Sequence, residues 1–291
     1  MIMQREYVNQ DIFFNAIPGQ VDPLSLRSRY QKKLLDSLKI YPLALSRSIN
    51  VDLSLQIIKI DKVDFQYRFS PILYALYAQI KNAYEKKKLD ELLDCIQLLN
   101  NESPENLYAN HLQYGTTLSE AWERPFLQEI RERVPLDESI HPITGRLKIL
   151  PLIHWSQNDF PPPIFHRSLN LLKTLDNFLF REVQAYVSRI KFYSSHTLHS
   201  VTSPRYFGAI YMRLPFIKED QELFFLETIV HETSHLHLFA IMDLNIIILN
   251  DEYDLYASPL RIDKRPMIGV FHAVFVLSRM VRVLHRYTRE I

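Results

Sequence analysis

Hydrophobic side chains recur along most of the chain at the three- and four-residue spacing of amphipathic helices. Asp22-Pro23 and Ser70-Pro71 each join a capping residue to a proline, a combination typical of a helix start. We expect helices from these points to about residue 39 and to the lysine run 86–88, and further helices over 90–99, 118–133 and 168–189. The last of these is the longest uninterrupted helical pattern before residue 219.

Several shorter segments have the composition of β-strands. Residues 190–195, 197–201 and 207–214 are rich in β-branched and aromatic side chains, and 147–155 is an apolar run. Two long helical patterns follow, one from about residue 219, with Asp220 as its expected capping residue, and one from Pro266 to about Arg289. The first half of the last helix is apolar all round, so this helix should be buried against the one before it. The sequence therefore predicts a mainly α fold (α+β with a small β element).

A turn-rich stretch between about Pro135 and Gly145 divides the chain. We expect a mainly helical region over residues 1–140 and a second region over 141–291, which contains the residues that carry chemistry.

Composition excludes several classes of protein. The 291 residues carry a formal charge of +1, which gives no bulk electrostatic support for nucleic-acid binding. A single cysteine, Cys95, excludes an intramolecular disulfide and fits a reducing cytosol, so we expect a cytoplasmic protein. The start of the chain lacks the apolar core of a signal peptide, and no apolar run approaches the length of a membrane span. Glycine-rich phosphate loops are also absent, which disfavours nucleotide-binding classes.

The candidate chemistry begins at His231-Glu232-Thr233-Ser234-His235, an H-E-x-x-H motif inside the helix expected from residue 219. Residues four apart lie one above the other on a helix, so His231 and His235 can bind one metal ion. Glu232 follows the first histidine, where a carboxylate can act on metal-bound water or orient the site. Apolar residues flank the motif on both sides, which predicts a buried helix whose histidines need partners.

Two histidines need a third protein ligand to make a stable metal site. His272 lies in the apolar last helix, and Glu252 lies in the acidic turn after the motif helix. Glu252 would give the layout of thermolysin-like zinc peptidases, which take a glutamate from a following helix. His237 lies about 200° around the helix from His235 and cannot share the same ion. Both His272 and Glu252 remain candidates on these grounds.

The segment before the last helix supplies two cations, Arg261 and Arg265, together with Tyr256 and Ser258. A guanidinium beside a metal suits a planar carboxylate, which it can hold through two parallel hydrogen bonds. Ordinary salt bridges with Asp263 or Glu252 are the alternative role for either arginine.

The order of these features resembles a bacterial family of H-E-x-x-H peptide-modification proteins, the αKG-HExxH-type peptide β-hydroxylases of ribosomal natural-product pathways. The resemblance covers roughly residues 190–285 and does not extend to the first half of the chain. It rests on Ser194-Ser195, the strand 207–210, the motif segment 229–235, and Gly269 and His272. Between the last two groups the family has a Ser-Pro-x-Arg-x-Asp-x-Arg-Pro segment, which matches residues 258–266 here.

The resemblance implies a non-haem iron(II) dioxygenase that uses 2-oxoglutarate and O₂ to hydroxylate a β-carbon in a ribosomally synthesised precursor peptide. His231, His235 and His272 would hold the iron, with Glu232 as an alternative oxygen ligand. This set departs from the usual two-histidine-one-carboxylate triad. Arg261 or Arg265 would pair with the distal carboxylate of 2-oxoglutarate. Tyr256 and Ser258 would lie in the same co-substrate site. Apart from the resemblance, the size and helicity of residues 1–140 alone lead us to expect that this region docks a leader peptide or shapes a substrate groove.

Two other functions fit the same residues. One is a zinc metallopeptidase with Glu232 as general base and Glu252 as third ligand. The other is a helical binding protein with a structural metal and no enzymatic activity.

Overall fold

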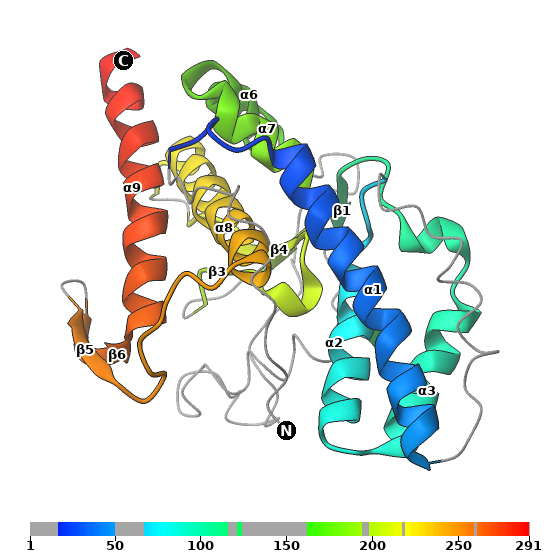
Figure 1. The fold of residues 1–291 in the computed structure, drawn as a ribbon. Helices are drawn as coiled ribbons and strands as arrows, with labels where there is room; N and C mark the ends of the chain where they lie inside the picture. The colour runs from blue at the N-terminus through cyan, green and yellow to red at the C-terminus, as the bar shows by residue number, and fades with distance from the viewer. Residues whose placement is uncertain are drawn as a thin grey trace, which may run out of the picture.

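The computed structural model describes residues 17–49, 67–115, 121–123, 162–193, 198–216, 219–258 and 261–290. Helices dominate this part of the chain, and the strands are few and short, so the predicted mainly α fold with a small β element is confirmed (Figure 1). The α-helices are α1 (Pro23–Ile49), α2 (Pro71–Glu85), α3 (Leu89–Asn101), α6 (Pro163–Leu175), α7 (Asn177–Tyr186), α8 (Gln221–Leu244) and α9 (Met267–Glu290). Short 3₁₀ turns lie at η3 (Pro104–Leu107), η4 (Ala121–Glu123) and η6 (Pro204–Tyr206).

The predicted starts of α1 and α2 are confirmed. The Asp22 carboxylate accepts a hydrogen bond of 2.9 Å from the backbone N–H of Ser25, in the first turn of α1. Ser70 has an extended backbone and makes no side-chain cap, so α2 starts because Pro71 is pre-set for the first helical position. α1 continues to Ile49, about ten residues beyond the predicted end.

The single helix predicted over 168–189 is wrong, because two helices, α6 and α7, meet at Asp176. Asp176 has an extended backbone, and its carboxylate accepts hydrogen bonds from the N–H groups of Phe178 and Leu179. Aspartate is among the strongest capping residues, and a cap in an otherwise helical pattern starts a new helix. The apolar periodicity continues across the break, which is why the pattern alone did not reveal it.

A four-stranded sheet lies inside the helices, in the order β1 (Gln113–Gly115), β2 (Arg189–Tyr193), β4 (Ala209–Arg213), β3 (Ser200–Val201). The first three strands are parallel and β3 is antiparallel to β4. β2 and β4 are almost wholly buried, as expected for parallel strands covered by helices. They confirm the strands predicted over 190–195 and 207–214. Edge-to-face rings of Phe165, Phe192 and Phe225 tie α6, β2 and α8 together at centroid distances of 5.3 to 6.1 Å.

One cluster of buried side chains joins α1, α2 and α3 to α6, α7, the sheet and α8. The predicted boundary at residues 140/141 and the predicted strand 147–155 lie outside the described residues. Most of the helix predicted over 118–133 also lies outside them, and its described part is the 3₁₀ turn η4.

The last helix, α9, packs along α8 on the side away from α2 and α3 (Figure 1). It is not enclosed as predicted, because Val274 and Val281 are exposed and few of its residues are fully buried. In the part of the chain that the structure describes, α9 is the helix long and apolar enough to cross a membrane, with a mean hydropathy of 1.7 over its best window. Its buried face nevertheless contains Arg279, which pairs with a carboxylate of α7.

A buried ion pair between Lys191 and Glu123 predicts a large loss of stability when the lysine is replaced. Their Nζ and Oε1 atoms are 2.8 Å apart, both side chains are buried, and the Tyr211 hydroxyl donates to the same carboxylate. Lys191→Met should lower the free energy of unfolding by about 3–5 kcal/mol, because it leaves a buried carboxylate without its cation. Urea denaturation measures this loss. The control is Lys33→Met, whose half-exposed pair with Asp243 should contribute less than about 1 kcal/mol.

Candidate metal centre

The helix that carries the motif is anchored where it begins. Asp220 caps α8 by accepting a 3.0 Å hydrogen bond from the N–H of Leu223, as the sequence predicted. Just before it, Arg213 at the end of β4 binds both carboxylate oxygens of Glu219 at 2.7 and 2.8 Å. The Arg213 guanidinium also lies 4.4 Å from the ring centroid of Phe224. These contacts fix the direction in which α8 leaves the sheet.

The Arg213 pair predicts a dependence of stability on pH. Its hydrogen bonds lower the pKa of Glu219 to about 2. A carboxyl whose pKa is lower in the folded state stabilises the fold above its unfolded pKa, and this contribution is lost as the pH falls. Between pH 4.5 and pH 2 the free energy of unfolding should therefore fall more steeply for the wild type than for Glu219→Gln. Equal slopes in acid denaturation curves would contradict this account.

The motif histidines lie on the accessible stripe of a helix that is otherwise buried. From Phe224 to Ile241 the side chains of α8 are buried, except for a half-buried set spaced four residues apart: Glu227, His231, His235 and Phe239. The buried helix predicted from the apolar flanks is thus confirmed. One face of it is open to a pocket, and the two imidazoles line that face.

Three imidazoles meet on this face. The Nε2 atoms of His231 and His235 are 3.2 Å apart, and their ring centroids are 4.9 Å apart. His272 comes from the first part of α9, and its Nδ1 lies 3.3 Å from Nδ1 of His235. The ring of Phe239 packs against both His235 and His272, at 5.9 and 5.5 Å between centroids. The structure therefore brings together two histidines that are four residues apart on α8 and a third that is distant in sequence.

The spacing of the first two nitrogens suits a shared metal ion. Two nitrogens each about 2.0–2.1 Å from one ion lie roughly 2.8–3.0 Å apart in octahedral geometry and roughly 3.3–3.4 Å apart in tetrahedral geometry. The nitrogen of His272, however, faces the other nitrogen of His235, and among the described residues no three His, Cys, Asp or Glu side chains already surround a single point. A third ligand from α9 therefore requires a side-chain rotation of His235 or His272.

Burial keeps His231 and His272 in the form that can bind a metal. Removal from water lowers the pKa of His231 to about 4, with a smaller contribution from His199, and also lowers the pKa of His272. Both rings are neutral at pH 7, and neutral imidazole is the ligand form of histidine.

Glu232 does not line the pocket, and its carboxylate is hydrogen-bonded to the sheet. Its side chain is buried, and Oε1 accepts a 2.5 Å hydrogen bond from the Ser200 hydroxyl on β3. The same oxygen lies 4.0 Å from Nε2 of His231, the nitrogen that faces His235. Ser200 was not singled out from the sequence, because a serine in a short strand carries no signal of what it will contact.

The pocket beside the histidines has a volume of about 250 Å³. It is lined by His231, His235, Ser258, Arg265, Gly269, His272, Ala273, Val276 and Leu277. The antiparallel hairpin of β5 (Leu255–Ser258) and β6 (Arg261–Pro266), at the start of α9, contributes the serine and the arginine (Figure 1). Arg265 is the charged residue among those that line the pocket, and its Nε donates a 3.1 Å hydrogen bond to the Asp263 carboxylate.

The remaining candidates lie elsewhere. The Tyr256 hydroxyl accepts a 2.8 Å hydrogen bond from the Asn250 side chain, and this tyrosine does not line the pocket. Glu252 is exposed in the turn that follows α8. The backbone of Arg261 pairs with Ser258 across the hairpin, and the structure describes only the backbone of this arginine. His237 lies on the opposite side of α8 from the pocket, as its position on the helix predicted.

Neither a protein-family model nor a curated protein matches this sequence. The resemblance to the peptide β-hydroxylases therefore remains a prediction from the order of motifs.

Proposed function

We propose that this chain is an Fe(II)- and 2-oxoglutarate-dependent dioxygenase that hydroxylates a β-carbon in a ribosomally synthesised precursor peptide. The observation that best supports this proposal is that His272 and Arg265 share one pocket with the motif histidines. Glu252, the ligand that a thermolysin-like peptidase would require, is exposed instead. The third donor nearest the motif is thus an imidazole, and it lies beside a cation suited to a carboxylate.

The size of the pocket supports a small acid as its occupant. Ligand pockets commonly measure ~300–1,000 Å³, so about 250 Å³ suits a co-substrate rather than a peptide. Arg265 would hold the distal carboxylate, with the Ser258 hydroxyl as a further donor. The apolar wall of Ala273, Val276 and Leu277 would cover the carbon chain and exclude water.

The histidines and Glu232 have different roles in this proposal. His231, His235 and His272 would hold the iron through neutral nitrogens, leaving positions for 2-oxoglutarate and O₂. Bound iron would supply the redox chemistry that no side chain of this site can supply. Glu232 is held by Ser200 and would fix α8 against β3 behind the site, so that the helix presents its histidines to the pocket.

A zinc metallopeptidase is the second candidate, and one contact favours it. Oε1 of Glu232 lies 4.0 Å from Nε2 of His231, the nitrogen that would face the metal, and this is near the place that a general base for a metal-bound water would occupy. With Glu252 outside the pocket, this function would have to take His272 as its third ligand.

Metal-dependent turnover separates the two candidates. Protein loaded with Fe(II) in the presence of ascorbate should convert 2-oxoglutarate to succinate. A precursor peptide encoded by a neighbouring gene should gain one oxygen atom, which mass spectrometry would detect. Zinc-loaded protein should leave the same peptide intact. Peptide cleavage with zinc, together with no succinate with iron, would reject the dioxygenase and favour the peptidase.

A further inference from the structure

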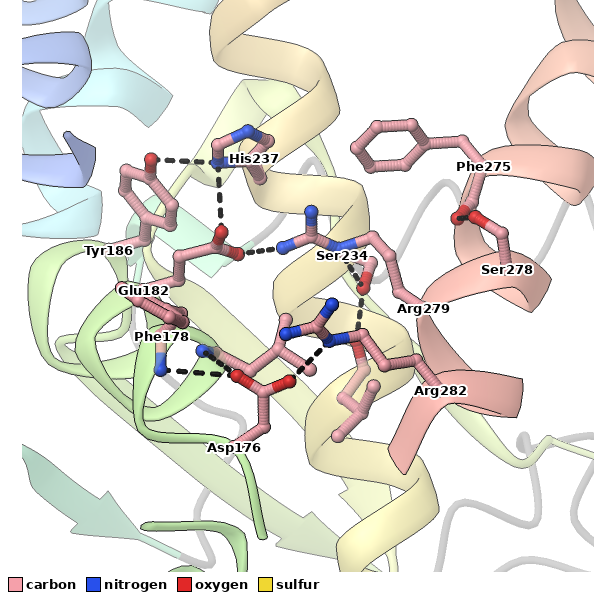
Figure 2. A network of polar contacts seen from close by, with 12 residues as sticks. Asp176, Phe178, Glu182, Tyr186, Ser234, His237, Phe275, Ser278, Arg279 and Arg282 are labelled. Carbon is pink, nitrogen blue, oxygen red and sulfur yellow. Dashed lines mark hydrogen bonds and ion pairs between the residues drawn. The ribbon is translucent and has the colours of Figure 1, made fainter. Parts of the chain in front are cut away.

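An ion pair is buried at the junction of α7, α8 and α9 (Figure 2). The Arg279 guanidinium of α9 pairs with the Glu182 carboxylate of α7, and its Nε donates to the Ser234 hydroxyl of α8 at 3.0 Å. The other Glu182 oxygen lies 3.7 Å from Nδ1 of His237, which shares a 2.9 Å hydrogen bond with the Tyr186 hydroxyl. One polar network therefore connects the three helices behind the pocket.

This network lies directly behind the metal-binding face. Ser234 immediately precedes His235 on α8, and Arg279 follows His272 by seven residues on α9. Seven residues are about two helical turns, so Arg279 and His272 lie on the same side of α9. The fully buried residues of α9 are Phe275, Val276, Arg279 and Val283, so the arginine is one of few anchors of this helix.

A buried ion pair does little for stability, because the cost of removing two charges from water offsets their attraction. Burial raises the pKa of Glu182 even though Arg279 opposes that rise, which reflects this cost. The best-attested use of such pairs is to specify one register of packed helices over others. Apolar contacts alone would allow α9 to slide or turn on α8, whereas a shift here would leave a buried charge without its partner.

We propose that the Arg279–Glu182 pair sets the register of α9 on α8 and thereby holds His272 beside His235. The proposal rests on the proposed function for the role of His272 as a ligand. A slip of one residue would move His272 by about 1.5 Å along α9 and turn it by about 100°. Either change removes the 3.3 Å approach of its Nδ1 to His235. Arg279 and Glu182 are positioning residues, since neither lines the pocket.

A second set of ion pairs on the same two helices provides a matched control. Arg282 and Arg286 of α9 bind the Asp176 carboxylate of α7 at 2.5 and 2.9 Å. Their side chains are 29% and 39% exposed, so water can replace a lost contact. Arg282→Met also leaves Asp176 paired with Arg286, and it should not disturb the register.

The test replaces both members of the buried pair, Arg279→Met with Glu182→Met, so that no unpaired charge remains. Ser234 keeps its bond to the carbonyl of Val230, and the melting temperature should be unchanged or higher. Co²⁺ is the probe. We expect its affinity to fall at least about tenfold, the lower end of effects from groups behind a metal site. The visible Co²⁺ spectrum should shift towards that of His272→Ala, whereas Arg282→Met should match the wild type.

A second measurement needs no metal. In metal-free protein the rings of His235 and His272, with centroids 5.5 Å apart, should give a nuclear Overhauser contact. The contact should disappear in the double variant and persist in Arg282→Met. If the double variant does not fold, Glu182→Gln takes its place: it keeps the shape of the side chain and removes the charge, so the ring contact and the Co²⁺ affinity should both fall. Retention of both in a folded Glu182→Gln protein would overturn the proposal.

The outcomes distinguish this proposal from the dioxygenase function. If the wild type binds Co²⁺ through His272 and the double variant keeps its affinity, spectrum and ring contact, the positioning role is wrong and the metal site stands. If the wild type binds no Co²⁺, the metal-dependent function is wrong. The ring contact then decides the positioning role by itself: its loss in the double variant supports the role, and its persistence overturns it.

Discussion

Replacing His272 with alanine is expected to weaken Fe(II) or Co²⁺ binding by at least about 100-fold, more than the 10–100-fold typical of groups outside the ligand shell. The reason is that His272 is the third imidazole lining the pocket, and a rotation of its ring or that of His235 would let it complete the ligand set. Two remaining histidines do not form a complete protein ligand set. Isothermal titration with each metal measures the loss, and succinate formation should disappear with it.

The matched control for this prediction is Glu252→Ala. Glu252 is exposed in the turn after α8, so the variant should keep the wild-type metal affinity. A peptidase that used Glu252 would give the reverse pattern, with metal lost in Glu252→Ala and retained in His272→Ala. If both variants bind metal as the wild type does, neither ligand set is correct.

The sequence predicted the parts of this site that depend on local periodicity. A spacing of four residues places His231 and His235 on one helical face whatever lies around them, and Asp220 caps the helix as expected. The apolar flanks correctly predicted that α8 is buried. They did not reveal that one stripe of α8, with both histidines on it, faces a pocket, because accessibility depends on where α9 and the hairpin pack.

The parts that were missed depend on distant segments. Ser200 meets Glu232 only because β3 pairs with β4 beside α8. In the sequence, nothing distinguishes Arg279 from the other arginines of the last helix. Only the packing of α7 shows its carboxylate partner. The opposite error occurred at α9, where an apolar composition predicted a more enclosed helix than is found. Composition alone does not state which face of a helix will find a partner.

The break at Asp176 shows the same limit within a single segment. Apolar residues keep helical spacing through 168–189, yet Asp176 caps a second helix and binds Arg282 and Arg286 of α9. From the sequence alone, an aspartate within a helical pattern can either lie on the surface of one long helix or cap a second helix. The arginines that favour the second alternative come from a distant segment of the chain. In this protein the cap and the ion pairs use the same carboxylate, so α7 begins where α9 is attached.

Arg265→Ala is expected to raise the KM for 2-oxoglutarate about 30-fold with little change in kcat. Truncating one member of a hydrogen-bonded charge pair costs about 2–5 kcal/mol, and the low end applies because the Arg265 side chain is 33% exposed. About 2 kcal/mol corresponds to a factor of about 30. A contact made equally in the ground state and the transition state changes KM and leaves kcat unchanged. Initial rates of succinate formation measure both constants.

A co-substrate analogue tests directly whether Arg265 binds the distal carboxylate. 2-Oxopentanoate has the carbon chain of 2-oxoglutarate but no distal carboxylate, so its KM should respond little to Arg265→Ala. The variant should lose most of the wild-type preference for 2-oxoglutarate over 2-oxopentanoate. Arg265→Lys should lie between the two, because lysine keeps the charge and lacks the planar fork. Arg261→Ala is the control from the same strand, and a larger loss of preference there would assign the carboxylate to Arg261 instead.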